Sequence, residues 1–291
     1  GRQELFSTLR QFQGLSGFPK PHESEHDAFI AGHASNSVSV ALGMARARTL
    51  QNRNYQVLAL IGDGALTGGL AYEGLNNAGA SGEPLIVILN DNGMSINPNV
   101  GAMSGHLAHL RTRPGYYHFK KWYRNALGHS RSGQRLYRFN HRIKTTVNKA
   151  VWPGSTFFED MGFTYLGPVD GHDVDRLCHV LEWARELRCP VVVHINTVKG
   201  KGYPIAEQMP DKFHGVSPFD PATGQPLAPS GESFSSVFGK TLSELTRQDG
   251  RVCAITAAMA SGTGLSGYAK AFPDHFFDVG IAEGHAVAMA A

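Results

Sequence analysis

Short apolar runs alternate with segments of helical period over most of this chain. Residues 57–61 and 85–89 are wholly apolar, as parallel strands buried on both faces usually are. Between them, Ala71, Leu75 and Ala78 recur at helical spacing and define one apolar face. Together these segments predict a strand–helix–strand unit in which both strands are buried.

The same alternation continues on both sides of this unit. Helices are predicted at residues 38–48, 174–187 and 234–245, near Tyr268 and from Glu283 onward. Further strands are predicted at residues 163–165, 191–195, 252–256 and 276–279. This order predicts an α/β fold: an open, mostly parallel sheet with helices on both faces, followed by the start of a second, similar domain.

Two stretches rich in Gly and Pro interrupt the pattern and set the expected domain bounds. Residues 1–30 are expected to be irregular, and residues 204–231 to form a surface linker. We expect a first domain at 1–203, with a basic helical insertion at about 101–150, and an incomplete second domain at 232–291. The chain lacks an initial Met and an apolar signal region, and its pattern stops inside a helix, so we expect a fragment.

Composition narrows the class of protein. Of the 291 residues, 42% are hydrophobic and 18% are charged, which is ordinary for a globular protein. No window approaches the ~18 consecutive apolar residues of a membrane-spanning helix, so we expect no membrane association. The three cysteines are odd in number and lack CxxC spacing, which predicts buried free thiols in a cytoplasmic protein.

Basic residues are concentrated in one part of the chain. No acidic residue occurs between Asp91 and Glu159, and residues 101–150 hold 11 Lys and Arg interleaved with aromatic residues. Nucleic-acid-binding proteins show such a pattern, but no nucleic-acid-binding motif accompanies it here. We therefore expect no nucleic-acid partner and interpret the segment as a solvated helical insertion that helps attract anionic ligands.

Polar triplets follow the first two predicted strands. Gly62-Asp63-Gly64 ends one strand and Asn90-Asp91-Asn92 ends the next, at the edge where open α/β sheets bind ligands. The Asp63 carboxylate and the Asn92 carbonyl are oxygen donors suited to Mg²⁺, and the neighbouring glycines let backbone amides approach a phosphate. Two ordinary turns would use the same residue types, since Gly and Asn favour positive φ, and the triplets alone leave both interpretations open.

Two rival motifs fail on their spacing. A dinucleotide-binding fingerprint needs a third glycine at the position that Thr67 occupies. Residues 22–26 match the HExxH zinc pattern, but they follow two prolines in an irregular segment, and His33 comes one step late for the third ligand. We interpret that match as chance.

Eight strings, taken together, carry a resemblance that spans nearly the whole chain. They are ESEHD at 23–27, GHAS at 32–35, IGDGA at 61–65, LNDNGMSI at 89–96, GPVDGHD at 167–173, KGKGY at 199–203, FH at 213–214 and DVGIAE at 278–283. In content and order they resemble the 1-deoxy-D-xylulose-5-phosphate synthase family of transketolase-like thiamine-diphosphate enzymes. The GDG and NDN pair is shared widely among thiamine-diphosphate enzymes, whereas GPVDGHD and the longer NDN string are more specific to this family.

The resemblance implies thiamine diphosphate and Mg²⁺ as cofactors, and it implies site residues. The implied metal ligands are Asp63, Asn92 and the backbone carbonyl of Met94. The implied cofactor contacts are Gly32, His33, Ala34, Gly64, Ala65, Asn92, Tyr203 and Glu283. The implied catalytic residues are Glu283, which would hydrogen-bond the aminopyrimidine ring, His33, and His214, which would face the substrate and move protons.

The resemblance also implies a reaction. A homodimeric cytoplasmic transferase would condense pyruvate with glyceraldehyde 3-phosphate, releasing CO₂ and supplying isoprenoid and thiamine biosynthesis. Alternatives are another transketolase-like ketol transfer, or a fragment or paralogue that binds cofactor without turnover. Gly284 stands where the family usually has Gln, and Ala257 and residues 260–263 also depart from its pattern. These departures bear on the acceptor-substrate contacts more than on the metal site.

Overall fold

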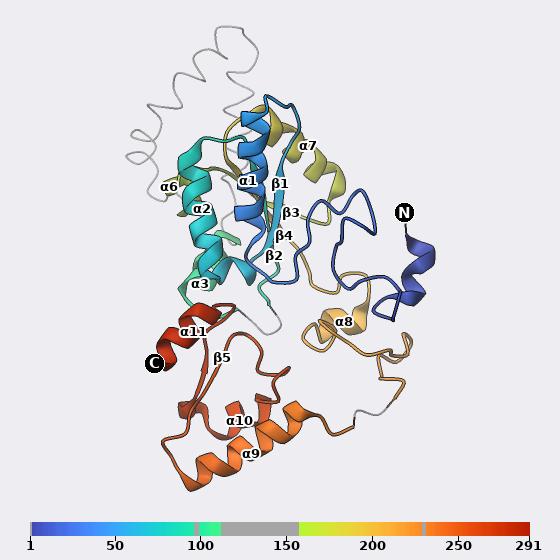
Figure 1. The fold of residues 1–291 in the computed structure, drawn as a ribbon, viewed down its shortest axis with the longest axis vertical. Coiled ribbons are helices and arrows are strands. Elements are labelled where there is room, and N and C mark those ends of the chain that lie inside the picture. The colour runs from blue at the N-terminus through green and yellow to red at the C-terminus, as the bar shows by residue number, and fades with distance from the viewer. Residues whose placement is uncertain (1, 96–98, 112–156, 229–230) are drawn as a thin grey trace.

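The computed structural model describes residues 2–95, 99–111, 157–228 and 231–291 (Figure 1). Its larger sheet has four parallel strands in the order β1-β2-β4-β3. The strands are β1 (Leu58–Gly62), β2 (Ile86–Asp91), β3 (Thr164–Asp170) and β4 (Val191–Asn196). The predicted open parallel sheet is therefore confirmed.

Helices cover both faces of this sheet, as the apolar pattern predicted. One core cluster joins it to α1 (Ser37–Leu50), α2 (Gly69–Ser81) and α3 (Ala102–Arg111), with the short α6 (Phe157–Asp160) beside them. The other joins the opposite face to α7 (Val174–Glu186), which lies across the sheet from α1 and α2 in Figure 1. The basic segment expected at about 101–150 falls on the described residues only at α3; residues 112–156 lie outside them.

The first strand departs from the prediction that it is buried on both faces. Leu58 and Leu60 are 48% and 63% exposed, while Ala59 and Ile61 are buried between them. In the described part of the chain β1 is an edge strand with one open face, and a run of apolar letters cannot distinguish one covered face from two. The strand predicted at 163–165 is also longer than expected, because it continues through a register shift after Leu166 to Asp170.

A second, smaller parallel sheet follows. Strands β5 (Ala254–Thr256) and β6 (Phe276–Asp278) pair in parallel, with helices α9 (Phe234–Gln248), α10 (Ser266–Ala271) and α11 (Glu283–Ala290) around them. Each of these elements lies where the periodicity predicted it. Short 3-10 helices occur at Gln3–Thr8, Ala65–Thr67 and Pro273–His275.

The segment expected as a linker has structure of its own. It begins with the short α8 (Pro204–Gln208), and Phe213 packs edge-on against both Tyr203 and Phe219 at centroid distances of 5.5 and 5.2 Å. These aromatic contacts hold the turns between 209 and 228 together. The domain bounds at 203 and 232 stay a prediction.

Two further observations concern the core and the cysteines. Arg48 and Glu83, each 6% exposed, form a buried ion pair with Nη2 and Oε2 3.4 Å apart. The expectation of three buried thiols is wrong, because Cys178 and Cys253 are exposed and only Cys189 is partly buried. No described helix is both long enough and apolar enough to cross a membrane.

Candidate functional site

The two polar triplets meet at one edge of the sheet. Strands β1 and β2 are parallel neighbours with Gly62 opposite Asn90, so the residues that follow each strand emerge side by side. Asp63 is 2% exposed, and its Oδ2 accepts hydrogen bonds from the backbone amide of Gly93 at 2.7 Å and from Asn99 Nδ2 at 2.8 Å. The sheet topology therefore places Asp63 directly against the loop that carries Asn92.

The other carboxylate oxygen of Asp63 distinguishes this edge from a pair of ordinary turns. Its Oδ1 is buried and has no hydrogen-bond partner among the described residues. A buried carboxylate oxygen left unpaired costs about 1–3 kcal/mol or more, and a cation would relieve that cost. The donor set of Asp63, Asn92 and the Met94 carbonyl offers oxygen only, which suits Mg²⁺.

Electrostatics support the same interpretation. Burial and the neighbouring carboxylate of Asp91 raise the pKa of Asp63 to about 6, although amides of Gly93 and Asn92 partly offset the shift. Two adjacent carboxylates in a dry site resist full ionisation, and a divalent cation between or beside them would favour it.

Lys199 is a candidate site residue that the sequence pattern did not single out. It follows β4, the strand next to β2, and its Nζ donates to the backbone carbonyl of Ser95 in the same loop as Asn92. Burial lowers the pKa of its ammonium, while Asp63 and Asp211 act in the opposite direction. A half-buried cation beside the loops of Asp63 and Asn92 is suited to binding a phosphate. The signal available in the sequence was its position shortly after the strand predicted at 191–195, which belongs to the same sheet.

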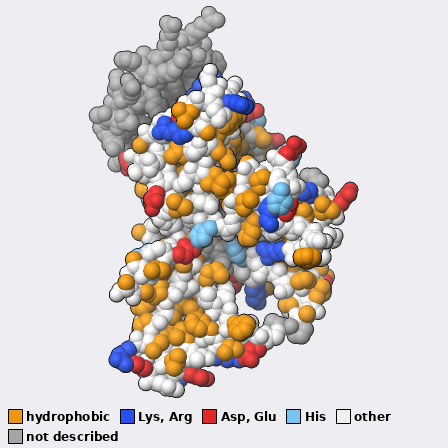
Figure 2. All heavy atoms as spheres, viewed as in Figure 1, with side chains coloured by type: hydrophobic (Ala, Val, Ile, Leu, Met, Phe, Trp, Pro, Cys, Tyr) orange, Lys and Arg blue, Asp and Glu red, His pale blue; other side chains and the backbone are white. Residues whose placement is uncertain are grey.

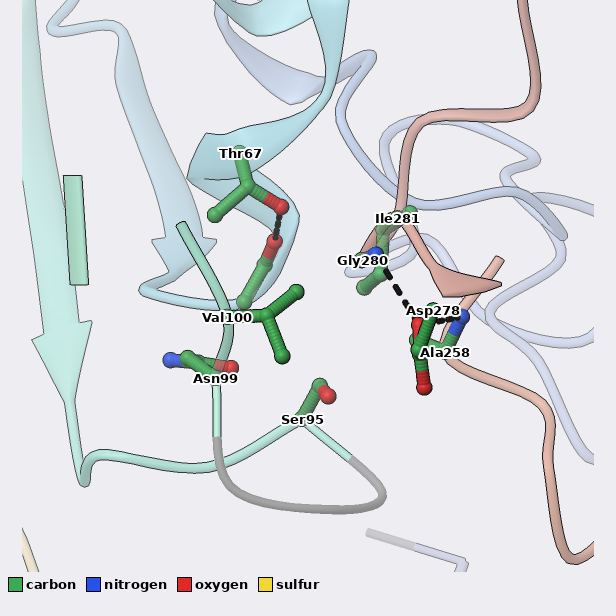
Figure 3. Close-up of a pocket in the computed structure, with 9 residues that line it drawn as sticks. Thr67, Ser95, Asn99, Val100, Ala258, Asp278, Gly280 and Ile281 are labelled. Atoms are coloured by element: carbon green, nitrogen blue, oxygen red, sulfur yellow. Dashed lines mark hydrogen bonds between the residues drawn. The ribbon is translucent and has the colours of Figure 1, made fainter. Parts of the chain in front are cut away.

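A narrow cleft runs between this edge and the second sheet (Figure 3). Gly64, Thr67, Ser95, Asn99 and Val100 line its first wall, and Ala258, Asp278, Gly280 and Ile281 line the second. Asp278 Oδ1 accepts the backbone amides of Ala258 at 2.9 Å and Gly280 at 3.0 Å, so one carboxylate fixes both loops of the second wall.

The loop that carries His33 joins the same place. Ser35, whose φ is +74°, donates from Oγ to the Ala65 carbonyl at 2.7 Å. A methyl group at Gly68 would lie 2.3 Å from that hydroxyl and 3.0 Å from the Ile281 carbonyl. Gly68 is therefore the point where the His33 loop, the Asp63 loop and the second sheet meet.

The structure brings together two of the predicted catalytic residues, although they are 250 positions apart. His33 Nε2 lies 3.1 Å from Glu283 Oε1, and the two side chains are 64% and 54% exposed. The Ala34 carbonyl, which contacts Nδ1 at 2.7 Å, and then Glu283 raise the pKa of His33. Figure 2 shows histidine side chains beside an acidic one at the recess across the middle of the visible face.

The remaining predicted residues have separate surroundings. Burial and the neighbouring Lys199 lower the pKa of His214, which connects it electrostatically to the metal edge. The Tyr203 hydroxyl donates to the Pro221 carbonyl at 2.8 Å and its ring packs in the aromatic cluster. Gly32 and Ala34 flank His33. The cofactor contacts assigned to these residues stay predictions.

The zinc alternative receives no support from the geometry. Residues 22–26 lie in turns and not on a helix. Glu23, the residue that would act as the base, accepts hydrogen bonds from the Arg2 guanidinium at 3.1 Å and from the Ser16 amide at 3.2 Å. Its carboxylate thus fastens the N-terminal turns.

Comparison with known proteins agrees with this geometry. The family model described as 1-deoxy-D-xylulose-5-phosphate synthase matches residues 1–197, and the model of the transketolase pyrimidine binding domain matches residues 231–291. A 1-deoxy-D-xylulose-5-phosphate synthase of Symbiobacterium thermophilum is 55% identical over 292 residues, covering 100% of this chain and 45% of that protein. One from Caldanaerobacter subterraneus subsp. tengcongensis is 52% identical, covering 100% of this chain and 47% of that protein.

The chain spans about half the length of the curated relatives it matches. A solved transketolase from Campylobacter jejuni covers 85% of this chain and 30% of its own, with 18% identity and a TM-score of 0.45, a likeness too low to bear on function. The family model covers well over half of the chain, and the relatives match it from end to end. This chain belongs to the 1-deoxy-D-xylulose-5-phosphate synthase family.

Proposed function

We propose that this chain carries the metal and diphosphate site, together with the acid–base glutamate, of a synthase that uses thiamine diphosphate and Mg²⁺. The reaction joins pyruvate to glyceraldehyde 3-phosphate, forming 1-deoxy-D-xylulose 5-phosphate with loss of CO₂. The relatives that match the chain are named for this product. The proposal extends to a cytoplasmic homodimer. Analytical ultracentrifugation of the chain would measure its stoichiometry.

The observation that carries the proposal is the unpaired, buried Oδ1 of Asp63. It lies at the carboxyl edge of a parallel sheet, beside the Asn92 loop and near a half-buried lysine. A metal-bridged diphosphate is the ligand that uses all three features, because the cation takes the carboxylate oxygen and the lysine takes a phosphate.

Residues at the carboxyl edge of the larger sheet would hold the metal and the diphosphate. Asp63, Asn92 and the Met94 carbonyl would ligate Mg²⁺, and Lys199 would balance the charge of the diphosphate. Backbone amides near Gly64 and Ala65 would approach the phosphate oxygens. A Cβ at Gly64 would lie 2.7 Å from Ser95 Cβ, so the glycine lets the loop after β2 pack against this segment. Gly32, His33, Ala34 and Tyr203 complete the contacts.

Bound thiamine diphosphate supplies a carbon nucleophile and an electron sink for cleavage of the pyruvate carboxylate. Glu283 would exchange a proton with a ring nitrogen of the bound aminopyrimidine, and the hydrogen bond with His33 would orient the glutamate. The lowered pKa of His214 keeps that imidazole neutral near pH 7, so it can accept a proton from a substrate hydroxyl.

Calorimetric titration of thiamine diphosphate with and without Mg²⁺ tests the site on the wild type, on Asp63→Ala and on Asp274→Ala, an exposed carboxylate of the second unit. We expect metal-dependent binding that Asp63→Ala abolishes and Asp274→Ala leaves unchanged. Binding that ignores both the metal and Asp63→Ala would refute the proposal.

Pyruvate-dependent release of CO₂ distinguishes the reaction from the alternatives. Turnover of a ketose phosphate without CO₂ would indicate another ketol transfer. Cofactor binding with no turnover, and with Glu283→Gln unchanged in every measured property, would indicate a chain that binds without catalysis.

A further inference from the structure

A row of buried polar side chains crosses three neighbouring strands behind the metal edge. Tyr165 on β3, His194 on β4 and Asp91 at the end of β2 are all 1% exposed or less. Tyr165 Oη lies 2.6 Å from His194 Nδ1, and His194 Nε2 lies 2.9 Å from Asp91 Oδ2. The strand order β2-β4-β3 makes this row possible, because the histidine strand lies between the other two.

The direction of the hydrogen bonds follows from the groups themselves. The phenol of Tyr165, whose pKa burial raises, stays protonated and can donate to Nδ1 of a neutral imidazole. The histidine then carries its hydrogen on Nε2 and donates it to the Asp91 carboxylate. Tyr165 thus selects the tautomer in which His194 can support an anionic partner.

The row ends at the loop after β2 that carries the proposed ligands Asn92 and Met94. Asp91 Oδ1 accepts the backbone amide of Gly93 at 3.2 Å, and the same amide donates to Asp63 Oδ2 at 2.7 Å. Asn92 lies between Asp91 and Gly93, which these hydrogen bonds anchor, and its Oδ1 accepts the Met94 amide at 3.0 Å. The orientation of Asp91 therefore fixes the loop that carries two of the three proposed ligands.

We infer that Tyr165 and His194 are positioning residues that orient Asp91 and, through the shared Gly93 amide, set the geometry of the divalent-cation site. The inference rests on the proposed metal site. It assigns a task to three buried polar side chains of a kind that well-packed hydrophobic residues often replace without loss of stability.

The backbone around His194 leaves little freedom. At Gly167 on β3, a Cβ would lie 2.5 Å from the His194 carbonyl oxygen and 2.9 Å from its Cβ. The ring of Tyr165 also stacks on Phe158, with centroids 5.9 Å apart and planes at 7°. Packing thus fixes the position of β4 and of the Tyr165 ring, while the hydrogen bonds select the tautomer of His194.

The test measures Mn²⁺ affinity by water-proton relaxation, without cofactor, on the whole chain. Tyr165→Phe should weaken binding about tenfold, and His194→Leu by about 10- to 100-fold, the usual range for groups that support metal ligands. His194→Gln, whose amide places a donor near the Nε2 position, should recover part of the affinity. Ring ¹⁵N shifts should show His194 protonated on Nε2 in the wild type and a mixture of tautomers in Tyr165→Phe.

Tyr268→Phe is the matched control. This tyrosine is equally buried and its hydroxyl lies 3.0 Å from Thr246 Oγ1, but it lies on α10, in the core beside the second sheet. We expect both Phe variants to lose comparable thermal stability and only Tyr165→Phe to lose Mn²⁺ affinity.

The outcomes separate the inference from the proposal beneath it. Wild-type binding of Mn²⁺ that requires Asp63, with unchanged affinity in His194→Leu or equal effects of the two Phe variants, overturns the inference alone. Failure of the wild type to bind Mn²⁺, or equal binding by Asp63→Ala, overturns the metal site and the inference with it.

Discussion

The raised pKa of Asp63 makes divalent-cation binding depend on pH within an unusual window. A metal must displace the proton from a carboxyl group whose pKa is about 6, so the apparent affinity falls by a factor of 1 + 10^(pKa − pH). This factor is about 11 at pH 5 and close to 1 at pH 7.5 for a pKa of about 6. An ordinary aspartate with a pKa near 3.8 would lose less than about 10% over the same interval.

The assay is Mn²⁺ binding by water-proton relaxation at pH 5, 6 and 7.5. Cofactor is omitted because its diphosphate titrates in the same range. We expect affinity to rise about tenfold between pH 5 and 7.5, with one proton released per metal at the low end. Asp63→Asn has no proton to displace and should bind weakly at every pH. Equal wild-type affinity at pH 5 and 7.5, or the same slope in Asp63→Asn, would show that burial and Asp91 do not control this carboxylate.

Three further predictions concern the stability of the fold. Gly68→Ala should lower the free energy of unfolding by about 1–3 kcal/mol in a urea titration, because its methyl would meet the Ser35 hydroxyl at 2.3 Å. Gly69→Ala, which has open space at the same point of the chain, should be neutral or stabilising. Glu83→Ala should lower the free energy of unfolding by about 3–5 kcal/mol, because the buried guanidinium of Arg48 loses its partner. Replacing both Arg48 and Glu83 by a hydrophobic pair should recover most of this loss. Mg²⁺ at about 100 times its Kd should raise the free energy of unfolding by about 2.7 kcal/mol at pH 7.5. The gain should be smaller at pH 5, where Asp63 is protonated. An equal gain in Asp63→Asn would mean that the ion binds elsewhere.

Much of the fold could be predicted from the sequence because its signals are local. Helical and strand periods located nearly every element of both sheets, and the rule that ligands bind at the carboxyl ends of parallel strands brought Asp63 and Asn92 together. The periods could not show which faces of a strand are covered by other elements. The apolar run at 57–61 predicted a buried strand, yet Leu58 and Leu60 are open, because burial depends on which neighbours a strand has.

The supporting residues escaped prediction for a related reason. Lys199 and His194 lie on or after β4, far along the chain from Asp63, and their letters fit a surface loop and a core strand equally well. Only the strand order, in which β4 lies beside β2, brings them to the metal edge. The contact between His33 and Glu283 was likewise not predicted: the resemblance named each residue, but no local pattern joins residues so distant.

The contacts around Gly68 and Gly280 explain why the proposed acid–base pair and the proposed metal site lie side by side. Gly280, whose φ is +73°, would place a Cβ 3.2 Å from Val100 and 3.4 Å from the Thr67 hydroxyl, so the second wall already contacts the first. Glu283 follows three residues later at the start of α11, and its reach to His33 depends on that contact. A larger residue at Gly280 would therefore displace Glu283 while leaving Asp63 and its loop in place. We expect Gly280→Val to retain Mn²⁺ affinity and to lower the pKa of His33 by the part that Glu283 contributes, measured by NMR titration, while the Ala34 carbonyl still raises it. A loss of Mn²⁺ affinity as well would mean that the two walls fold as one inseparable unit.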